Sequence, residues 1–258
     1  MTIWEMLAVF AAGIGAGTIN TIVGSGTLIT FPVLLGVGLP PVTATVSNGL
    51  GLVAGSISGA IGYRAELAGQ RARVLRLSAV AAVGGVAGAA LLLTLPSTAF
   101  ETIVPVLVAL ALVLVVLQPR ISRAVQRRRE KTGTTPHPDG GPLLLAGLLA
   151  ASVYGGYFTA AQGIIYMALM GMLIDDTLQR LNATKNILAA VVNSVAAIFF
   201  LFAADFDWTA VVLIAVGSTI GGQIGAKTGR KLSPTVLRAL IVVVGTVALV
   251  QLLIQRYG

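Results

Sequence analysis

The chain has 258 residues, of which 56% are hydrophobic and only 10% are charged, and its net charge is +8. A soluble domain carries about 25% charged residues, so the composition excludes an ordinary soluble protein and indicates a membrane protein. The absence of cysteine excludes disulfide bonds and thiolate metal sites. The basic residues flank apolar segments, so we interpret them as cytoplasmic anchors and not as a nucleic-acid surface.

The first apolar region, residues 3–39, is interrupted by glycines and polar residues. At its centre it reads "GIGAGTINTIVGSGTLITF", residues 13–31. A simple membrane anchor needs neither a Gly-Ser-Gly sequence nor an asparagine at this place. The region begins with Glu5 and no basic residue, unlike a cleaved signal peptide, so we expect it to stay in the membrane.

Three uninterrupted apolar windows follow, at about 42–62, 74–95 and 99–118. Each is long enough for a membrane span of about 20 residues. Residues 119–141 are basic and contain Pro and Gly, which predicts a cytoplasmic loop. A second interrupted region comes next, at 142–174, and three further clean windows complete the chain, at 183–204, 209–226 and 234–254.

The two halves of the chain repeat one pattern. The segment "VTATVSNGLGLV" at 42–53 aligns without gaps with "LNATKNILAAVV" at 181–192, at an offset of 139 residues. The same offset pairs Gly24 with Gly163. We therefore divide the chain into a first transmembrane repeat at 1–118, a basic cytoplasmic loop at 119–141 and a second transmembrane repeat at 142–258.

The basic clusters predict the orientation of the chain in the inner membrane. The segments 64–76, 119–141 and 227–231 are basic and should be cytoplasmic, whereas 203–208 has two aspartates and no basic residue and should be outside. The loops 64–76 and 203–208 are repeat counterparts, so the two repeats are inverted, which is typical of transporters. Both termini are predicted to lie outside.

The interrupted regions are predicted to form broken hairpins. Residues 142–174 must leave and return on the cytoplasmic side, but 33 residues are too few for two full spans. By symmetry, 3–39 forms the same hairpin from the outside, with its turn near Gly24-Ser25-Gly26. The predicted fold is an all-α polytopic membrane protein with two inverted repeats, each a broken re-entrant-like hairpin plus three transmembrane helices.

Paired interruptions in two repeats predict a binding site made of half-helix ends. None of the nine carboxylates lies at the centre of a span, and the single histidine, His137, lies in the central loop. We therefore expect no metal site, no cofactor and no enzymatic activity. Amides, hydroxyls and helix N-termini donate hydrogen bonds, which suits an anion. The candidate substrate-binding residues are Asn20, Gly24, Ser25, Gly26, Thr27, Thr45, Asn48, Gln162, Gly163, Thr184, Lys185 and Asn186.

Lys185 has two interpretations. A lysine deep in a span is costly and marks function, so it could supply the counter-charge for an anion. It could also extend to the cytoplasmic surface from its place near the start of a helix. The asparagines could instead bond between helices, and the hydroxyls could bond their own helix backbone.

Two motifs resemble one known family. The segment "GAGTINTIVGSGTLITFPVLLGVGLPPVTATVSN" is similar to the first-repeat motif of the sulfite exporter TauE/SafE family of membrane permeases. In the second half of the chain, the segment "YGGYFTAAQGIIYMALMGML", followed by "LNATKN", is similar to the family's second-repeat motif. Ala183-Thr184-Lys185 in this chain matches the Ala-Thr-Lys core of that motif. This resemblance implies transport of sulfite, organosulfonates or related small anions.

The predicted function is a permease that moves such an anion by alternating access, in contact with the lipid bilayer and with no nucleic-acid partner. A homo-oligomer is compatible with the sequence. Two other classes stay open, namely a channel or facilitator for a small solute and a non-transporting membrane partner protein. A water-filled pore would favour the channel, and a dry, solid core at Gly24 and Gly163 would favour the partner protein.

Overall fold

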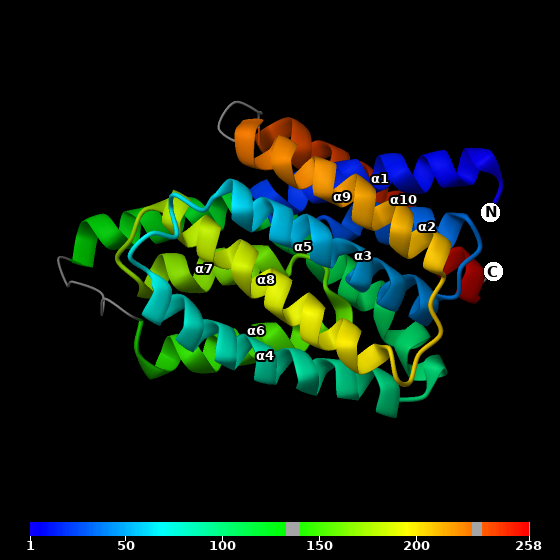
Figure 1. The fold of residues 1–258 in the computed structure, drawn as a ribbon, viewed down its shortest axis with the longest axis horizontal. Coiled ribbons are helices and arrows are strands. Elements are labelled where there is room, and N and C mark those ends of the chain that lie inside the picture. Colours follow the sequence, from blue (N-terminus) through cyan, green and yellow to red (C-terminus); the bar gives the residue numbers. More distant parts are fainter. Residues whose placement is uncertain (133–139, 229–233, 258) are drawn as a thin grey trace.

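The computed structural model of the protein describes residues 1–132, 140–228 and 234–257, which form ten α-helices (Figure 1). Seven of them are long and apolar enough to cross a membrane within these ranges. The helices are α1 Ile3–Ile22, α2 Thr27–Gly36, α3 Pro41–Gly62, α4 Arg71–Thr94, α5 Ser97–Thr132, α6 Gly141–Phe158, α7 Gln162–Leu173, α8 Leu178–Phe200, α9 Trp208–Thr228 and α10 Pro234–Tyr257.

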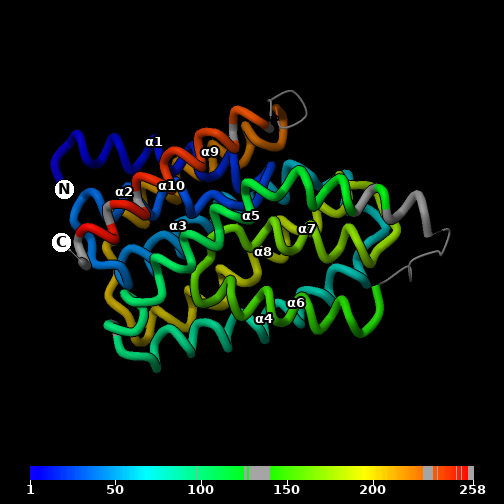
Figure 2. The backbone as a smooth tube through the Cα atoms, turned by 180° about the vertical axis from the view of Figure 1, so that it is seen from behind, coloured from blue at the N-terminus to red at the C-terminus, as the bar shows by residue number. Residues whose placement is uncertain are grey.

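The helices run along the long axis of the molecule, and the two ends of the bundle differ. The start of α1 and the end of α10 lie together at one end, which we call the termini end (Figures 1 and 2). The loop 63–70, the loop 174–177 and the starts of α4 and α8 lie at the opposite end, which we call the basic end (Figure 1). The described basic clusters therefore gather at the end away from both termini, as the charge pattern predicts.

Helix packing follows the same scheme in both halves. Helix α9 packs between α1 and α3. In the equivalent arrangement of the other half, helix α4 packs between α6 and α8. This defines an α1 group, consisting of α1, α2, α3 and α9, and an α6 group, consisting of α4, α6, α7 and α8. The groups meet where α3 contacts α8, and α5 contacts α10 beside them.

Glycines allow the close approach of helices within each group. A Cβ atom on Gly217 would lie 2.6 Å from the carbonyl oxygen of Phe10, and one on Gly55 would lie 2.6 Å from the Cβ of Ser218. Rows of glycines spaced by four residues let helix backbones touch. The glycine rows of α3 and α9 therefore serve packing.

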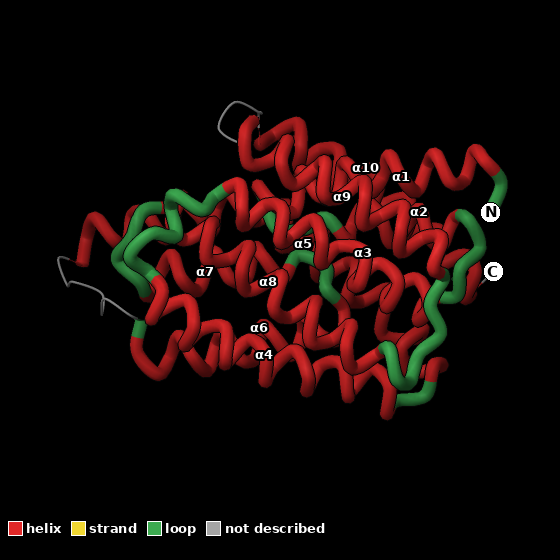
Figure 3. Tube along the Cα trace, in the orientation of Figure 1, coloured by secondary structure: helices red, strands yellow, loops and turns green. Residues whose placement is uncertain are grey.

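Each interrupted region forms a hairpin with one long and one short arm (Figure 3). Helix α1 has 20 residues and α2 only 10, while α6 has 18 and α7 has 12. Helix α1 enters from the termini end and α2 returns to it, whereas α6 and α7 do the same from the basic end (Figure 1). The prediction of one short arm is confirmed, and each long arm is itself long enough to count as a span.

One detail of the sequence analysis is wrong. The predicted loop at 119–141 is helical in its first part, because α5 continues to Thr132. Arg, Gln, Glu and Lys are good helix formers, so the helix continues after the apolar segment ends. The second break lies at 159–161, and Gly163 is already in the first turn of α7. His137, Arg230 and Lys231 lie outside the described residues.

Candidate functional site at the crossing of two helix breaks

The first break, residues 23–26 between α1 and α2, contacts the start of α7 through the backbone, directly after the second break at 159–161. The amide of Gly163 donates to the carbonyl oxygen of Gly24 at 3.1 Å. Gly24 has a φ of 90°, and a Cβ atom on it would lie 2.5 Å from the Cα of Gly163. Only glycine adopts this backbone conformation without strain and leaves room for such an approach. The two glycines that the repeat alignment pairs are therefore in direct contact.

The N-terminus of α2 carries hydrogen-bond donors that have no partner among the residues described. Leu28 is the first residue of α2 whose amide finds an acceptor, the carbonyl of Ser25. Among the described residues, none accepts from the amides of Ser25, Gly26 or Thr27. The Ser25 hydroxyl is fully buried and has no partner in the part of the chain that the structure describes. Because a helix N-terminus is the positive end of the helix dipole, this place favours an anion.

Thr27 and Asn48 belong to one buried network beside this N-terminus. The Asn48 amide nitrogen donates to Thr27 Oγ1 at 3.1 Å, and the Asn48 amide oxygen accepts from the Thr30 hydroxyl. Thr27 Oγ1 also lies 3.0 Å from Thr159 Oγ1, in the second break. Thr27 therefore links the start of α2 to the other hairpin.

Lys185 points to the C-terminal end of α1. Its side chain is buried, with 1% of the residue exposed, and Nζ donates to the carbonyl oxygens of Asn20 at 2.8 Å and Thr21 at 3.1 Å. The last carbonyls of a helix have no partner within the helix and form the negative end of its dipole. The ammonium group thus caps α1, and the interpretation that Lys185 extends to the surface is wrong.

Two asparagines of α8 share the same acceptor. The side-chain nitrogens of Asn182 and Asn186 lie 3.1 Å and 3.5 Å from the carbonyl oxygen of Thr21. Asn182 is not among the predicted site residues, although it lies in the same "LNATKN" segment one turn before Asn186. Thr21 takes part through its backbone, which no side-chain pattern can indicate.

Two predicted hydroxyls bond their own helices. Thr45 Oγ1 donates to the Pro41 carbonyl at 2.9 Å, and Thr184 Oγ1 donates to the Arg180 carbonyl at 3.1 Å. Both bonds span one helical turn, the alternative that sequence reasoning left open for hydroxyl groups. Neither side chain contacts a break through a hydrogen bond.

Three other predicted residues have structural partners. The Asn20 side chain donates to Ser56 Oγ at 3.2 Å, within the α1 group. The Gln162 side chain donates to the Tyr166 hydroxyl at 2.7 Å, within α7. Gly26 packs against α1, where a Cβ atom would lie 3.0 Å from the Cβ of Asn20. These residues shape the breaks from their flanks.

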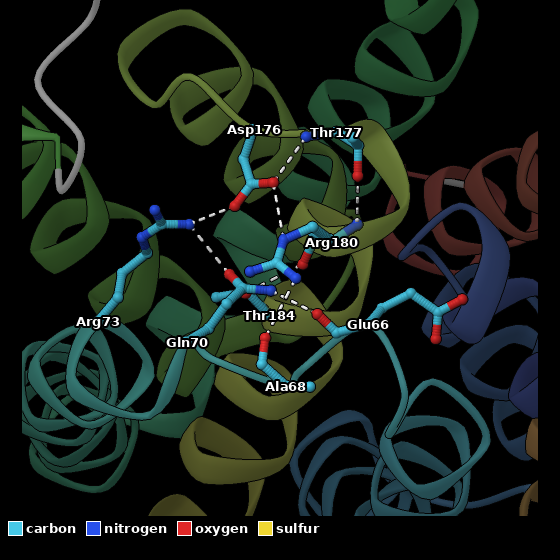
Figure 4. Close-up of polar contacts among 8 residues, drawn as sticks. All are labelled: Glu66, Ala68, Gln70, Arg73, Asp176, Thr177, Arg180 and Thr184. Carbon is cyan, nitrogen blue, oxygen red and sulfur yellow. Dashed lines mark hydrogen bonds and ion pairs between the residues drawn. The ribbon is translucent and has the colours of Figure 1, made fainter.

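A polar cluster at the basic end holds the start of α8 (Figure 4). Asp176 lies between Arg73 Nη1 at 2.6 Å and Arg180 Nε at 2.8 Å, and it accepts from the Thr177 amide at 2.8 Å. Arg180 also donates to the carbonyl of Ala68 at 3.1 Å. Burial by itself would raise the pKa of Asp176, but the hydrogen bonds from Arg73, Thr177 and Arg180 outweigh it and lower that pKa.

Gln70 connects this cluster to the site helix. Its Oε1 lies 3.0 Å from Arg73 Nη1 and 3.4 Å from Thr184 Oγ1, and its Nε2 donates to the Glu66 carbonyl at 2.6 Å (Figure 4). The first two turns of α8 are therefore fixed to α4 and to the loop 63–70. Lys185 follows directly on α8.

The electrostatics of the crossing are dominated by one charge. Among the side chains that the structure describes within residues 1–132, 140–228 and 234–257, Lys185 is the only buried ionisable acid or base apart from tyrosines. Its observed acceptors are neutral carbonyls. In the same ranges no group of three His, Asp or Glu side chains could hold a metal ion. The crossing thus combines one ammonium group with amide and hydroxyl donors.

Comparison with known proteins gives one family and several relatives. The family model described as "Sulfite exporter TauE/SafE" matches residues 9–252. The probable membrane transporter protein YfcA of Escherichia coli is 27% identical over 249 residues, which cover 94% of this chain and 87% of the relative. A probable membrane transporter protein of Haemophilus influenzae is 24% identical over 243 residues, which cover 93% and 91% of the two chains. No solved structure matches the chain.

Proposed function

The chain belongs to the sulfite exporter TauE/SafE family and is a multi-pass membrane transporter, and we propose that its substrate is a small anion bound at the crossing of the two breaks. We take this anion to be sulfite, an organosulfonate or a related sulfur oxyanion. Lys185 is the observation that carries the proposal.

An unpaired lysine in the membrane requires a reason. Burying it costs about 2.5–3.5 kcal/mol even on scales that measure insertion by the translocon. Lys185 has no carboxylate partner among the described residues, and its carbonyl acceptors carry only partial charges. An anion bound beside the ammonium group would supply the missing negative charge.

The donors needed for an oxyanion lie close to this ammonium group. A Cβ atom on Gly163 would lie 3.0 Å from Lys185 Cδ, and Gly163 contacts Gly24, which precedes Ser25 in the chain. An ammonium group has three N–H donors, and two of the Lys185 donors already have carbonyl acceptors. The third, together with the free Ser25 hydroxyl and the free amides at 25–27, forms the proposed anion site.

We propose alternating access as the mechanism, with the α1 group and the α6 group as the inverted moving parts. The basic end faces the cytoplasm and the termini end faces outward, following the positive-inside rule. The close contact at Gly24 and Gly163 is then a closed state. A packed crossing also fits a non-transporting partner protein, but the relatives described as probable membrane transporters favour transport.

Binding can be measured by thermal unfolding of the purified full chain with sulfite, sulfate, thiosulfate or methanesulfonate. A binder at 100 times its Kd stabilises the folded state by about 2.7 kcal/mol. We expect Lys185→Ala to weaken binding at least about 100-fold, since a charge-assisted contact and the counter-charge are lost together. Lys227→Ala, at an exposed lysine near the end of α9, should bind normally.

Transport is tested separately with the full chain in proteoliposomes. We expect uptake of the best-binding anion to saturate and to be lost in Lys185→Ala but not in Lys227→Ala. Stabilisation by none of the four anions, or equal binding by the two variants, would contradict the proposed site. Binding without uptake would favour the non-transporting alternative.

A further inference from the structure

The hydrogen bonds between the two helix groups are concentrated at the breaks. Among the described residues, the side-chain hydrogen bonds that join a helix of the α1 group to the α6 group come from Thr27, which faces Thr159, and from the α8 residues Asn182, Lys185 and Asn186. The Gly163 amide adds one backbone bond. The α8 bonds all end on the last turn of α1.

We propose that Lys185 is a latch released by the anion, an inference that rests on the proposed function and adds how binding there moves the protein. In the empty site, the ammonium group holds the end of α1 against α8. An anion at the crossing takes the ammonium group away from the carbonyls of Asn20 and Thr21. The contact between the two helix groups is then weakened at this point, where only the neutral bonds from Asn182 and Asn186 remain between α8 and α1.

The exchange of partners is favourable for the ammonium group. A helix C-terminus carries about half a negative charge, whereas an oxyanion carries at least one. The bonds from the ammonium group to the carbonyls are already charge-assisted, because the donor is ionised, so the gain comes from the larger charge of the acceptor. Lys185 therefore gains interaction free energy when it moves from a carbonyl to an anion.

The end of α1 tolerates the loss of this donor. The Thr21 carbonyl still has Asn182 and Asn186 within reach at 3.1 Å and 3.5 Å, so it is not left without a partner. Only the Asn20 carbonyl loses its donor when Lys185 leaves. A shared acceptor of this kind makes the contact reversible.

A purely structural cap does not explain a lysine at this position. Helix α6 ends at a break of the same kind, and the repeat counterpart of Lys185 is Val46, at the 139-residue offset. The second break thus forms without a cation supplied from that position. The charge at the first break is therefore available for a role that a neutral cap could not perform.

Hydrogen–deuterium exchange of the purified full chain tests the latch, with peptides that cover residues 19–24 and 159–165 as reporters, which leave out the amides at 25–27 that the anion itself would protect. We expect a saturating concentration of methanesulfonate or sulfite to speed exchange in both peptides about tenfold, because a hydrogen bond to a charged group contributes about 1.5 kcal/mol or more. Lys185→Met should speed exchange to a similar degree without the anion and should not respond to it. Lys227→Met is the matched control and should behave as the unmodified chain does.

Asn182→Ala separates the latch from simple capping. This variant removes a neutral donor to Thr21 and keeps the ammonium group. We expect it to speed exchange by about threefold and to keep its response to the anion. Loss of the response in Asn182→Ala would mean that the cap as a whole, and not Lys185, senses the ligand.

The outcomes distinguish the latch from the proposed function. Unchanged exchange in Lys185→Met, in folded protein, would overturn the latch whether or not the chain binds anions. If Lys185→Met does not fold, the unmodified chain decides the matter, because a bound anion that leaves exchange unchanged also overturns release. If no anion binds the unmodified chain, the proposed function and the anion-released latch both fail, and faster exchange in Lys185→Met would identify Lys185 only as a cap of α1. A bound anion that leaves exchange unchanged overturns the latch alone.

Discussion

The two breaks use the same backbone device but carry different chemistry. In the first, Gly24 adopts a φ of 90° and α8 supplies an ammonium group and two amides to the end of α1. In the second, Ala161 adopts a φ of 57°, no glycine is present at 159–161, and Val46 stands where the lysine would be. Both breaks stop a helix within the bundle, but only the first receives a charge.

In the proposed mechanism, this difference separates movement from recognition. Similar hairpins and matching helix contacts in the two groups are what the proposed alternating access requires. Recognition of a charged substrate needs only one cation, and a second buried cation would add a desolvation cost of several kcal/mol. A symmetric backbone with an asymmetric set of side chains meets both requirements.

The strongest test of the comparison substitutes the residue with a left-handed backbone conformation in each break, Gly24 in the first and Ala161 in the second. Gly24→Ala should destabilise the fold by about 3 kcal/mol or more, because the new Cβ adds left-handed strain and would lie 2.5 Å from the Cα of Gly163. Ala161→Gly removes strain at the second break and should leave the unfolding temperature unchanged or raise it. Thermal unfolding of both purified variants measures the effect.

Gly36→Ala is the control for this exchange. Gly36 also lies in the first hairpin, but a Cβ atom there meets nothing within 4 Å. We expect its stability to match that of the unmodified chain. A Gly24→Ala protein that is as stable as Gly36→Ala would show that the two breaks do not need their close contact.

The next test concerns the charge of the substrate. With one buried ammonium group, a singly charged anion is neutralised, but a doubly charged anion keeps an uncompensated buried charge that costs about 3–5 kcal/mol. We therefore expect methanesulfonate to bind at least about 100-fold more tightly than sulfate, which has a similar size. Competition binding measures the ratio, and equal affinities would mean that a further cation contributes to the site.

Ser25 provides a smaller test of the first break. Its hydroxyl is buried without a partner, so Ser25→Ala should not lower the unfolding temperature. If the hydroxyl serves the anion, the same variant should weaken binding about fivefold, as for one hydrogen bond of about 1 kcal/mol. Ser152→Ala is the control near the second break, because that hydroxyl bonds Tyr166 and its loss should affect stability instead of affinity.

The smallest expected effect concerns Asp176, which helps to hold α8 for the first break. Its pKa is lowered in the folded state, so its contribution to stability is present above the pKa of an unfolded aspartate, about 3.9, and is lost as the pH falls through the folded pKa. Asp176→Asn should therefore be slightly less stable than the unmodified chain at pH 7. This difference should disappear as the pH falls below about 4.

The sequence was sufficient for the fold class and for the pairing of the breaks. Repeat alignment placed Gly24 beside Gly163, because both the hydrophobic pattern and the glycines recur at one offset. It did not locate the second break at 159–161, because no glycine is present there and Ala161 adopts a backbone conformation that glycine adopts most easily. The continuation of α5 was missed because a basic, proline-containing segment is also typical of a loop.

The site was harder to predict, because its decisive acceptor is a backbone group. Composition and motif pointed to Lys185, but the sequence suggested only two places for its side chain, the cytoplasmic surface or a contact with the substrate. The capping of α1 depends on how α8 crosses α1, a tertiary arrangement that no local pattern encodes. For the same reason Thr45 and Thr184 looked like ligands and are bonded to their own helices.

The capping of α1 by α8 has a consequence for the order in which the protein is made. Lys185 and its acceptor Asn20 are 165 residues apart in the chain. At about 5–20 residues per second, roughly 8 to 33 seconds of synthesis separate them. During that time the carbonyls of Asn20 and Thr21 at the end of α1 lack the donors that α8 later supplies. The first break, although it is translated early, is therefore completed only after most of the chain has been inserted.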